Sequence, residues 1–105
     1  MNTLAARLNR IERVWFYRAS GDTEIIPHKI PPYHETVEIL TGGEVFFDID
    51  GRTKRFGRGA IFWHRVEEET VCRTTAEAPY RCAAFHFSVK DCNRPAPRVS
   101  FWNRD

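Results

Sequence analysis

Two patterns of apolar residues divide this chain. Between Thr3 and Val14, apolar positions recur at intervals of three and four residues, with arginines and a glutamate between them. The repeating apolar residues are Leu4, Leu8 and Ile11. This spacing predicts a short amphipathic helix over residues 1–14, with Asn2 or Thr3 as its N-cap. After Val14 the pattern changes to short runs of β-branched and aromatic residues separated by Gly, Pro and Asp, which predicts successive strands.

The region after the predicted helix is expected to be all-β. We place strands near residues 14–18, 24–30, 34–40, 44–48, 53–56, 60–65, 69–74 and 80–89. The strongest hairpin signal is Asp50-Gly51, because this dipeptide supplies the positive φ angles of a tight turn. Eight short strands with frequent corners predict a jelly roll or barrel over residues 15–90.

The last part of the chain is expected to be a tail. Pro95 and Pro97 exclude a regular central strand or a helix interior there. Residues 91–105 are therefore predicted to be a proline-containing tail or linker. Phe101 and Trp102 follow the prolines, and such large aromatics usually pack on something, here either the barrel or a partner.

Bulk composition narrows the class of protein. With 105 residues the chain has room for one domain, and 42% hydrophobic content is ample for a packed core. A net charge of +2 gives no argument for nucleic acid by itself. There is no apolar run of signal-peptide or membrane-spanning length, so we expect a cytoplasmic protein that does not contact a membrane.

The three cysteines, Cys72, Cys82 and Cys92, are evenly spaced and lack a Cys-x-x-Cys pair. This spacing does not fit a zinc ribbon or a redox motif. We expect free thiols, with a Cys72–Cys82 cross-strand bridge as the alternative.

Candidate chemistry begins in the predicted strand 34–40. Because successive strand residues point to opposite faces, His34, Thr36 and Glu38 share one side with Leu40. A polar row on an otherwise apolar strand predicts a lined cavity. The alternative is a hydrogen-bonded structural pair at the mouth of the barrel.

Two later strands add further candidates. In the strand 60–65, either Trp63 or the pair formed by Phe62 and His64 faces inward. In the last long strand His86 alternates with small residues, which leaves space beside the imidazole for a ligand. A strand histidine with a satisfied structural hydrogen bond is the competing interpretation. The predicted ligand-binding residues are His34, Glu38, Trp63, His64 and His86.

The run from Pro31 to Glu44 resembles the first motif of the cupin superfamily. It is most similar to the N-terminal sensor and dimerisation domain of AraC-type transcription regulators, in which a His followed four residues later by Glu leads into an apolar strand and a Gly turn. Here these residues are His34, Glu38 and Gly42-Gly43, and the resemblance covers roughly residues 24 to 89. It implies a cupin-like jelly-roll barrel that binds a sugar or another small metabolite and forms a homodimer.

The resemblance also bears on DNA binding. AraC-type regulators contact DNA through helix-turn-helix units that follow the barrel, and nothing after Val89 has the length or helical periodicity of such units. We therefore expect DNA contact only through a region absent from this chain.

Cupins hold a divalent transition metal with two His and one Glu of the first motif and a further His of the second. Pro32 and Thr70 stand where two of these histidines are expected. Four residues of extended strand also separate His34 from Glu38 by about 13 Å, which one ion cannot bridge without a bulge. We expect no cofactor and no enzymatic activity. The alternative is a free-standing metal-dependent cupin enzyme, such as an isomerase, epimerase or dioxygenase, with His34, Glu38 and His86 as ligands.

Overall fold

The computed structural model describes residues 8–19, 29–49, 51–66, 68, 73–90 and 97–102. These residues form an all-β structure of antiparallel sheets, and none of them lies in a helix. The strands are β1 (Leu8–Arg18), β2 (His34–Gly42), β3 (Val45–Ile49), β4 (Arg52–Phe56), β5 (Ala60–His64), β6 (Arg73–Thr74), β7 (Arg81–Val89) and β8 (Val99–Phe101). Within the described part of the chain there is no helix long and apolar enough to cross a membrane.

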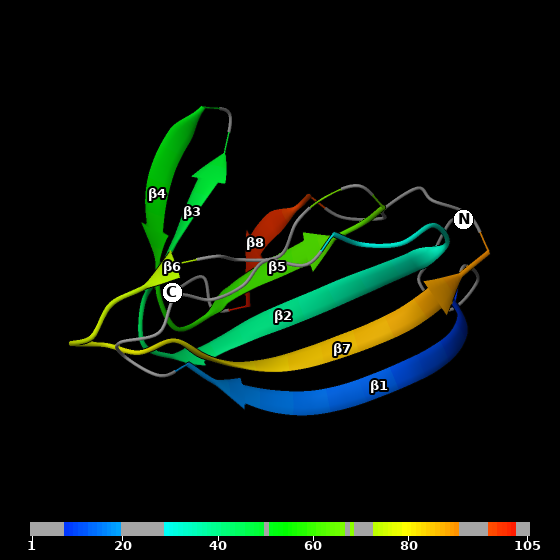
Figure 1. Ribbon diagram of the computed structural model, residues 1–105, viewed down its shortest axis with the longest axis horizontal. Coiled ribbons are helices and arrows are strands. Elements are labelled where there is room, and N and C mark those ends of the chain that lie inside the picture. The colour runs from blue at the N-terminus through cyan, green and yellow to red at the C-terminus, as the bar shows by residue number, and fades with distance from the viewer. Residues whose placement is uncertain are drawn as a thin grey trace.

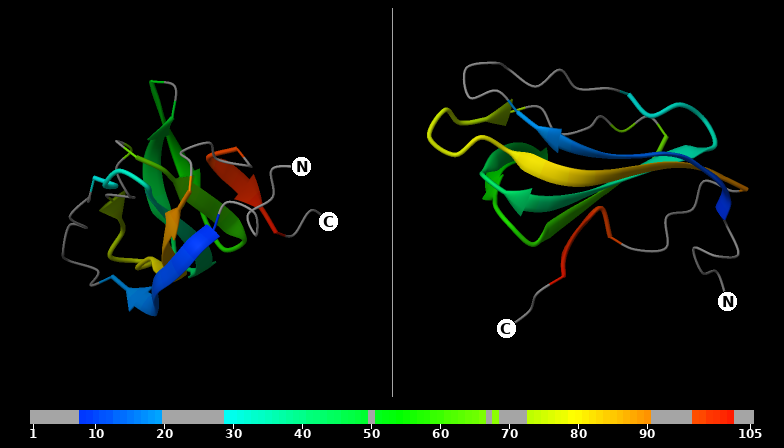
Figure 2. Two further views of the ribbon diagram at one scale, coloured as in Figure 1. Left: turned by 90° about the vertical axis from the view of Figure 1, so that its right-hand side faces the viewer. Right: turned by 90° about the horizontal axis from the view of Figure 1, so that it is seen from below.

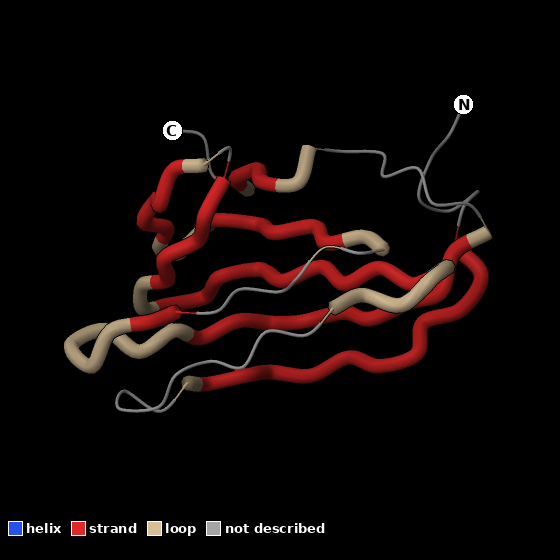
Figure 3. The backbone as a smooth tube through the Cα atoms, turned by 45° about the horizontal axis from the view of Figure 1, so that its top comes forward, coloured by secondary structure: helices blue, strands red, loops and turns tan. Residues whose placement is uncertain are grey.

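The larger sheet has five strands in the order β1-β7-β2-β5-β8 (Figure 1). Its three longest strands, β1, β7 and β2, lie side by side along most of the length of the molecule (Figure 3). Thr36 of β2 pairs with His86 of β7 and with His64 of β5. Because directly paired residues point to the same face, this register gathers the polar side chains of three strands on one inner face.

The smaller sheet has three strands in the order β4-β3-β6. The β3–β4 hairpin stands away from the plane of the larger sheet in both Figure 1 and the end-on view of Figure 2. At its base, Val45 and Phe47 belong to one buried core with Leu40 and Phe62 of the larger sheet. Phe47 meets Phe62 edge to face at 5.3 Å between ring centroids. The two sheets are thus joined by packing at one end, an arrangement compatible with a barrel-like fold.

The predicted N-terminal helix is wrong over residues 8–14, which belong to β1 and pair with β7, while residues 1–7 lie outside the described residues. The register of β1 shifts between Leu8 and Arg10 and again between Ile11 and Arg13. Each shift inserts one extra residue, so Leu8, Ile11 and Val14 all return to the same face of the sheet at intervals of three. Two β-bulges therefore reproduce the spacing that predicted a helix.

Part of the predicted tail belongs to the larger sheet. Residues Val99–Phe101 form β8, which pairs with β5 and places Phe101 opposite Ala60. The ring of Phe101 lies 6.4 Å from that of Phe56, so this aromatic packs on the same chain. Of the other predicted strands, most of 24–30 and of 69–74 lies outside the described residues.

The turn between β2 and β3 depends on Gly43. Its φ is +72°, in the left-handed region, and a Cβ built on it would lie 2.0 Å from the carbonyl oxygen of Pro79. Beside it, the backbone N–H of Glu44 donates to the carbonyl of Ala78 at 2.8 Å. The backbone of this turn therefore packs directly on the loop that leads into β7. Gly51, in the β3–β4 turn, has a φ of +76° but no atom within 4 Å of such a Cβ.

These two glycines provide a matched test. Gly51→Ala should lower the free energy of unfolding by about 1 kcal/mol, the cost of a left-handed alanine. Gly43→Ala adds a collision with backbone and should cost at least about 3 kcal/mol. Chemical denaturation of both variants measures the difference. Equal losses would show that the contact between Gly43 and Pro79 does not constrain the fold.

Candidate functional site

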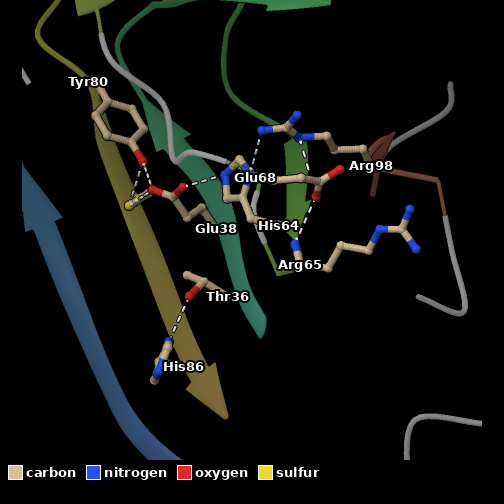
Figure 4. A network of polar contacts seen from close by, with 9 residues as sticks. Thr36, Glu38, His64, Arg65, Glu68, Tyr80, His86 and Arg98 are labelled. Atoms are coloured by element: carbon tan, nitrogen blue, oxygen red, sulfur yellow. Dashed lines mark hydrogen bonds and ion pairs between the residues drawn. The ribbon is translucent and has the colours of Figure 1, made fainter. Parts of the chain in front are cut away.

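The polar side chains of the inner face fall into two groups (Figure 4). The first, which we call the carboxylate network, surrounds Glu38 in the core. The second, the imidazole pair, consists of His34 and His86 with Thr36. The sequence placed His34, Glu38 and His86 in a single site, whereas the structure divides them between these two groups.

Glu38 is the centre of the carboxylate network and is only 8% exposed. The distance between its Oε1 and Nε2 of His64, from β5, is 2.8 Å. Its Oε2 accepts a short hydrogen bond from the hydroxyl of Tyr80, just before β7. A buried carboxylate is tolerated only when such donors replace water, so the side chains of three segments are held to one position.

His64 extends the network towards β8. A terminal guanidinium nitrogen of Arg98 lies 3.2 Å from Nδ1 of His64. Because a guanidinium only donates, Nδ1 accepts, and Nε2 carries the proton that is donated to Glu38. Arg98 also lies 3.7 Å from the carboxylate of Glu68 and over the ring of Phe47. The imidazole is thereby fixed in one tautomer.

Tyr80 and Cys82 close the other end of the network. The Tyr80 hydroxyl lies 3.0 Å from the sulfur of Cys82. Burial, and then the negative charge of Glu38, raises the pKa of Tyr80 well above its usual range. Burial likewise raises the pKa of Cys82 to about 12. Cys82 carries a free thiol, as expected, and at neutral pH it stays protonated and is a poor nucleophile.

The imidazole pair lies farther along the same face. The rings of His34 and His86 are nearly parallel, with 10° between their planes and 5.2 Å between their centroids. Nδ1 of His86 is hydrogen-bonded to Oγ1 of Thr36 at 2.8 Å, and Nδ1 of His34 lies 2.9 Å from the carbonyl of Pro32. Both histidines are half-buried, so solvent reaches this pair, unlike His64.

Trp63 belongs to neither group. It lies on the opposite face of β5 from His64, where its indole N–H donates to Oε1 of Glu35 at 2.9 Å. Its ring meets Phe87 edge to face at 6.1 Å. Of the two alternatives left open by the sequence, the inward one is therefore the pair Phe62 and His64. Trp63 lies on the other face of the sheet from the remaining predicted ligand-binding residues.

No group of three or more His, Cys, Asp or Glu side chains that could hold a metal ion occurs among the described residues. Glu38 and His86 are engaged by different partners, His64 and Thr36. The ligand set considered for a metal, His34, Glu38 and His86, is thus not assembled around one point.

Sequence reasoning missed several members of the site. Tyr80 and Arg98 reach Glu38 and His64 only through long-range strand pairing, which no local pattern reveals. Arg13 and Trp15 lie on the inner face of β1, because they pair with His86 and Ala84 of β7. Arg13 and Trp15 stand two residues apart, as residues on one face of a strand do, but the sequence pattern predicts a helix at Arg13.

Replacing Tyr80 by Phe tests the carboxylate network. The change removes a donor to a buried carboxylate and should lower the free energy of unfolding by about 2 kcal/mol. Tyr17→Phe is the control, because Tyr17 is 38% exposed and packs its ring 5.7 Å from that of Tyr80. That variant should change stability by less than about 0.5 kcal/mol. Equal effects in denaturant titrations would argue against the network.

A second prediction concerns pH. Burial, and then the positive charge of His34, lowers the pKa of His86, although Glu12 opposes the shift and Arg13 adds to it. The pKa of His86 in the folded state is below its unfolded value of about 6.5. The contribution of His86 to the free energy of unfolding is therefore complete above that pH and is lost as the pH falls through the folded pKa. Unfolding free energies from about pH 8 to about pH 5 should fall less in His86→Gln than in the wild type. Identical pH profiles would contradict this assignment.

No protein-family model, curated protein or solved structure matches this chain. Its carboxylate network is closed and buried, whereas its imidazole pair is half-buried and can exchange partners with a ligand.

Proposed function

We propose that this chain is a small-molecule sensing domain of the kind found in AraC-type regulators, with a cupin-like jelly-roll barrel that binds a hydroxylated metabolite, a sugar in the first instance. The resemblance around His34 and Glu38 suggests the class. The ligand site is the imidazole pair rather than the carboxylate network, and DNA would be contacted by a region outside these residues.

The hydrogen bond between Thr36 and His86 is the observation that carries this proposal. It joins a hydroxyl to a half-buried imidazole, the type of contact that a sugar hydroxyl can make in its place. The ring of His34 is stacked on that of His86 and supplies another nitrogen at the same point. A few polar groups that converge on a partly enclosed face are typical of small-molecule sites.

Strand β1 supplies the apolar contact that such a site needs. Trp15 pairs with Ala84 on the inner face, and the guanidinium of Arg13 lies 4.4 Å from the centroid of its ring. Ala84 is 1% exposed and belongs to the buried core, against which Trp15 packs. The stacking role that the sequence suggested for Trp63 thus passes to Trp15, and Arg13 adds a donor for hydroxyl or carboxylate groups.

Sensing requires that the ligand favours one arrangement of the chain over another. The carboxylate network fixes β2, β5 and β7 relative to one another, so this part of the barrel is expected to stay rigid. Among the described strands, β1 pairs only with β7, and it carries Arg13 and Trp15. A ligand that contacts these side chains would therefore act mainly on the position of β1.

A screen of pentoses, hexoses and sugar acids by thermal shift, followed by calorimetry on the hits, tests the proposal. A true ligand should bind about tenfold more weakly to Thr36→Val, which keeps the shape and loses the hydroxyl. Thr41→Val is the control, because Thr41 is an exposed residue of the same strand. No binding by any compound, or equal affinity in both variants, would contradict a site at the imidazole pair.

A further inference from the structure

The outer margin of β1 is a long strand edge that no described strand covers. β1 is the first strand of the five-stranded sheet and, of the strands that the structure describes, pairs only with β7; Figure 3 shows it at the margin of the sheet. It is eleven residues long. Such an edge presents unpaired backbone N–H and C=O groups that can accept a further strand.

The other edges are better protected. β8, at the opposite margin of the same sheet, has three residues, and β6 has two. The edge strand β4 has the sequence RTKRF, in which every residue but the phenylalanine is exposed. Short strands and runs of positive charge are devices that prevent edge-to-edge association. β1 has neither protection along its second half, where Val14, Trp15, Phe16 and Tyr17 follow one another.

The side chains next to this edge are unusually exposed for their type. Phe16 is 83% exposed, and Val14 and Ile11 are 54% and 57% exposed. All three lie on the outer face of the sheet, because they pair with Ala83, Phe85 and Phe87 of β7. The edge therefore offers apolar contacts as well as hydrogen bonds.

The regular part of β1 is its second half. Both register shifts lie before Arg13, and from Arg13 to Arg18 the pairing with β7 is unbroken. Bulges bend a strand and blunt its edge. An incoming strand would therefore find its straightest template between Arg13 and Arg18, a segment whose middle is close to Trp15.

We propose that the edge of β1 pairs antiparallel with β1 of a second copy of this chain, with the two-fold axis at Trp15. This register places Val14 opposite Phe16 on the outer face of the joined sheet. On the inner face, it places Arg13 opposite Tyr17, where a guanidinium can lie on an aromatic ring.

Avoidance of like charges favours this register over its neighbours. With the axis at Trp15, no arginine faces another, and Glu12 stays paired with Arg10 of its own chain at 2.8 Å. An axis at Val14 places Arg10 opposite Arg18, and an axis at Arg13 makes that residue face itself. An axis at Phe16 avoids like charges but sets Val14 against Arg18. Only the Trp15 register matches apolar with apolar and keeps like charges apart along the strand.

Sedimentation equilibrium on the whole chain tests the interface. The wild type should dimerise, and Phe16→Asp should weaken the dimer about 100-fold, because each dimer loses two buried rings and gains two charges. Tyr33→Asp is the control, since Tyr33 is another exposed aromatic, 59% exposed and outside β1, and this variant should dimerise like the wild type. Circular dichroism and thermal unfolding establish that both variants fold.

Disulfide trapping tests the register. Val14→Cys mixed with Phe16→Cys should cross-link faster than either variant alone, because the two positions are directly opposed only when the axis lies at Trp15. Mass spectrometry distinguishes the new bridge from any that involves the native cysteines. A wild type that stays monomeric up to about 1 mM would overturn the proposal. So would a dimer whose affinity Phe16→Asp does not change, or a mixture that cross-links no faster than the single variants. None of these outcomes depends on a ligand.

Discussion

The burial of the Glu38 carboxylate is the constraint on which the rest of the structure depends. A carboxylate removed from water is strongly unfavourable unless donors reach it, and here the donors come from His64 of β5 and from Tyr80. A slip of β2 by one residue would turn Glu38 outward and leave both donors buried without it. The carboxylate network therefore selects one register for the central strands, and Arg98 extends the same constraint to the segment that carries β8.

This constraint separates the polar groups of the inner face into two sets, the carboxylate network and the imidazole pair. The polar groups near the small sheet are used to hold the fold, and Cys82 and Tyr80 remain protonated there because burial raises their pKa values. The two imidazoles of the imidazole pair are half-buried, and Thr36 lies on a strand whose position the network has already fixed. In the proposed function, a ligand would replace the hydrogen bond between Thr36 and His86 without disturbing the core.

Strand alternation was enough to predict the inner face but not its contacts. It correctly placed His34, Thr36, Glu38 and Leu40 on one face. The hairpin at Gly51 was predicted by the turn dipeptide Asp50-Gly51 instead, and β3 and β4 do pair there. Strand alternation failed in β1, because two bulges give strand residues a helical spacing. It also could not join Arg98 to His64, since that contact depends on β8 pairing with β5, and a segment with two prolines gives no local sign of a strand.

Strand β1 connects the two proposals, because it is at once a wall of the inner face and the margin of the sheet. Arg13 and Trp15 lie on the same face of the sheet as the imidazole pair, whereas Val14 and Phe16 lie on the outer face beside the free edge. In the Trp15-centred register, the backbones that carry the two Trp15 rings are direct neighbours across the two-fold axis. By thermodynamic linkage, a ligand that fixes β1 in the pairing position must strengthen the dimer by the same factor by which dimerisation strengthens its own binding. Coupling of this kind would need no movement of the carboxylate network. One rigid core could then support both the proposed ligand site and the proposed interface.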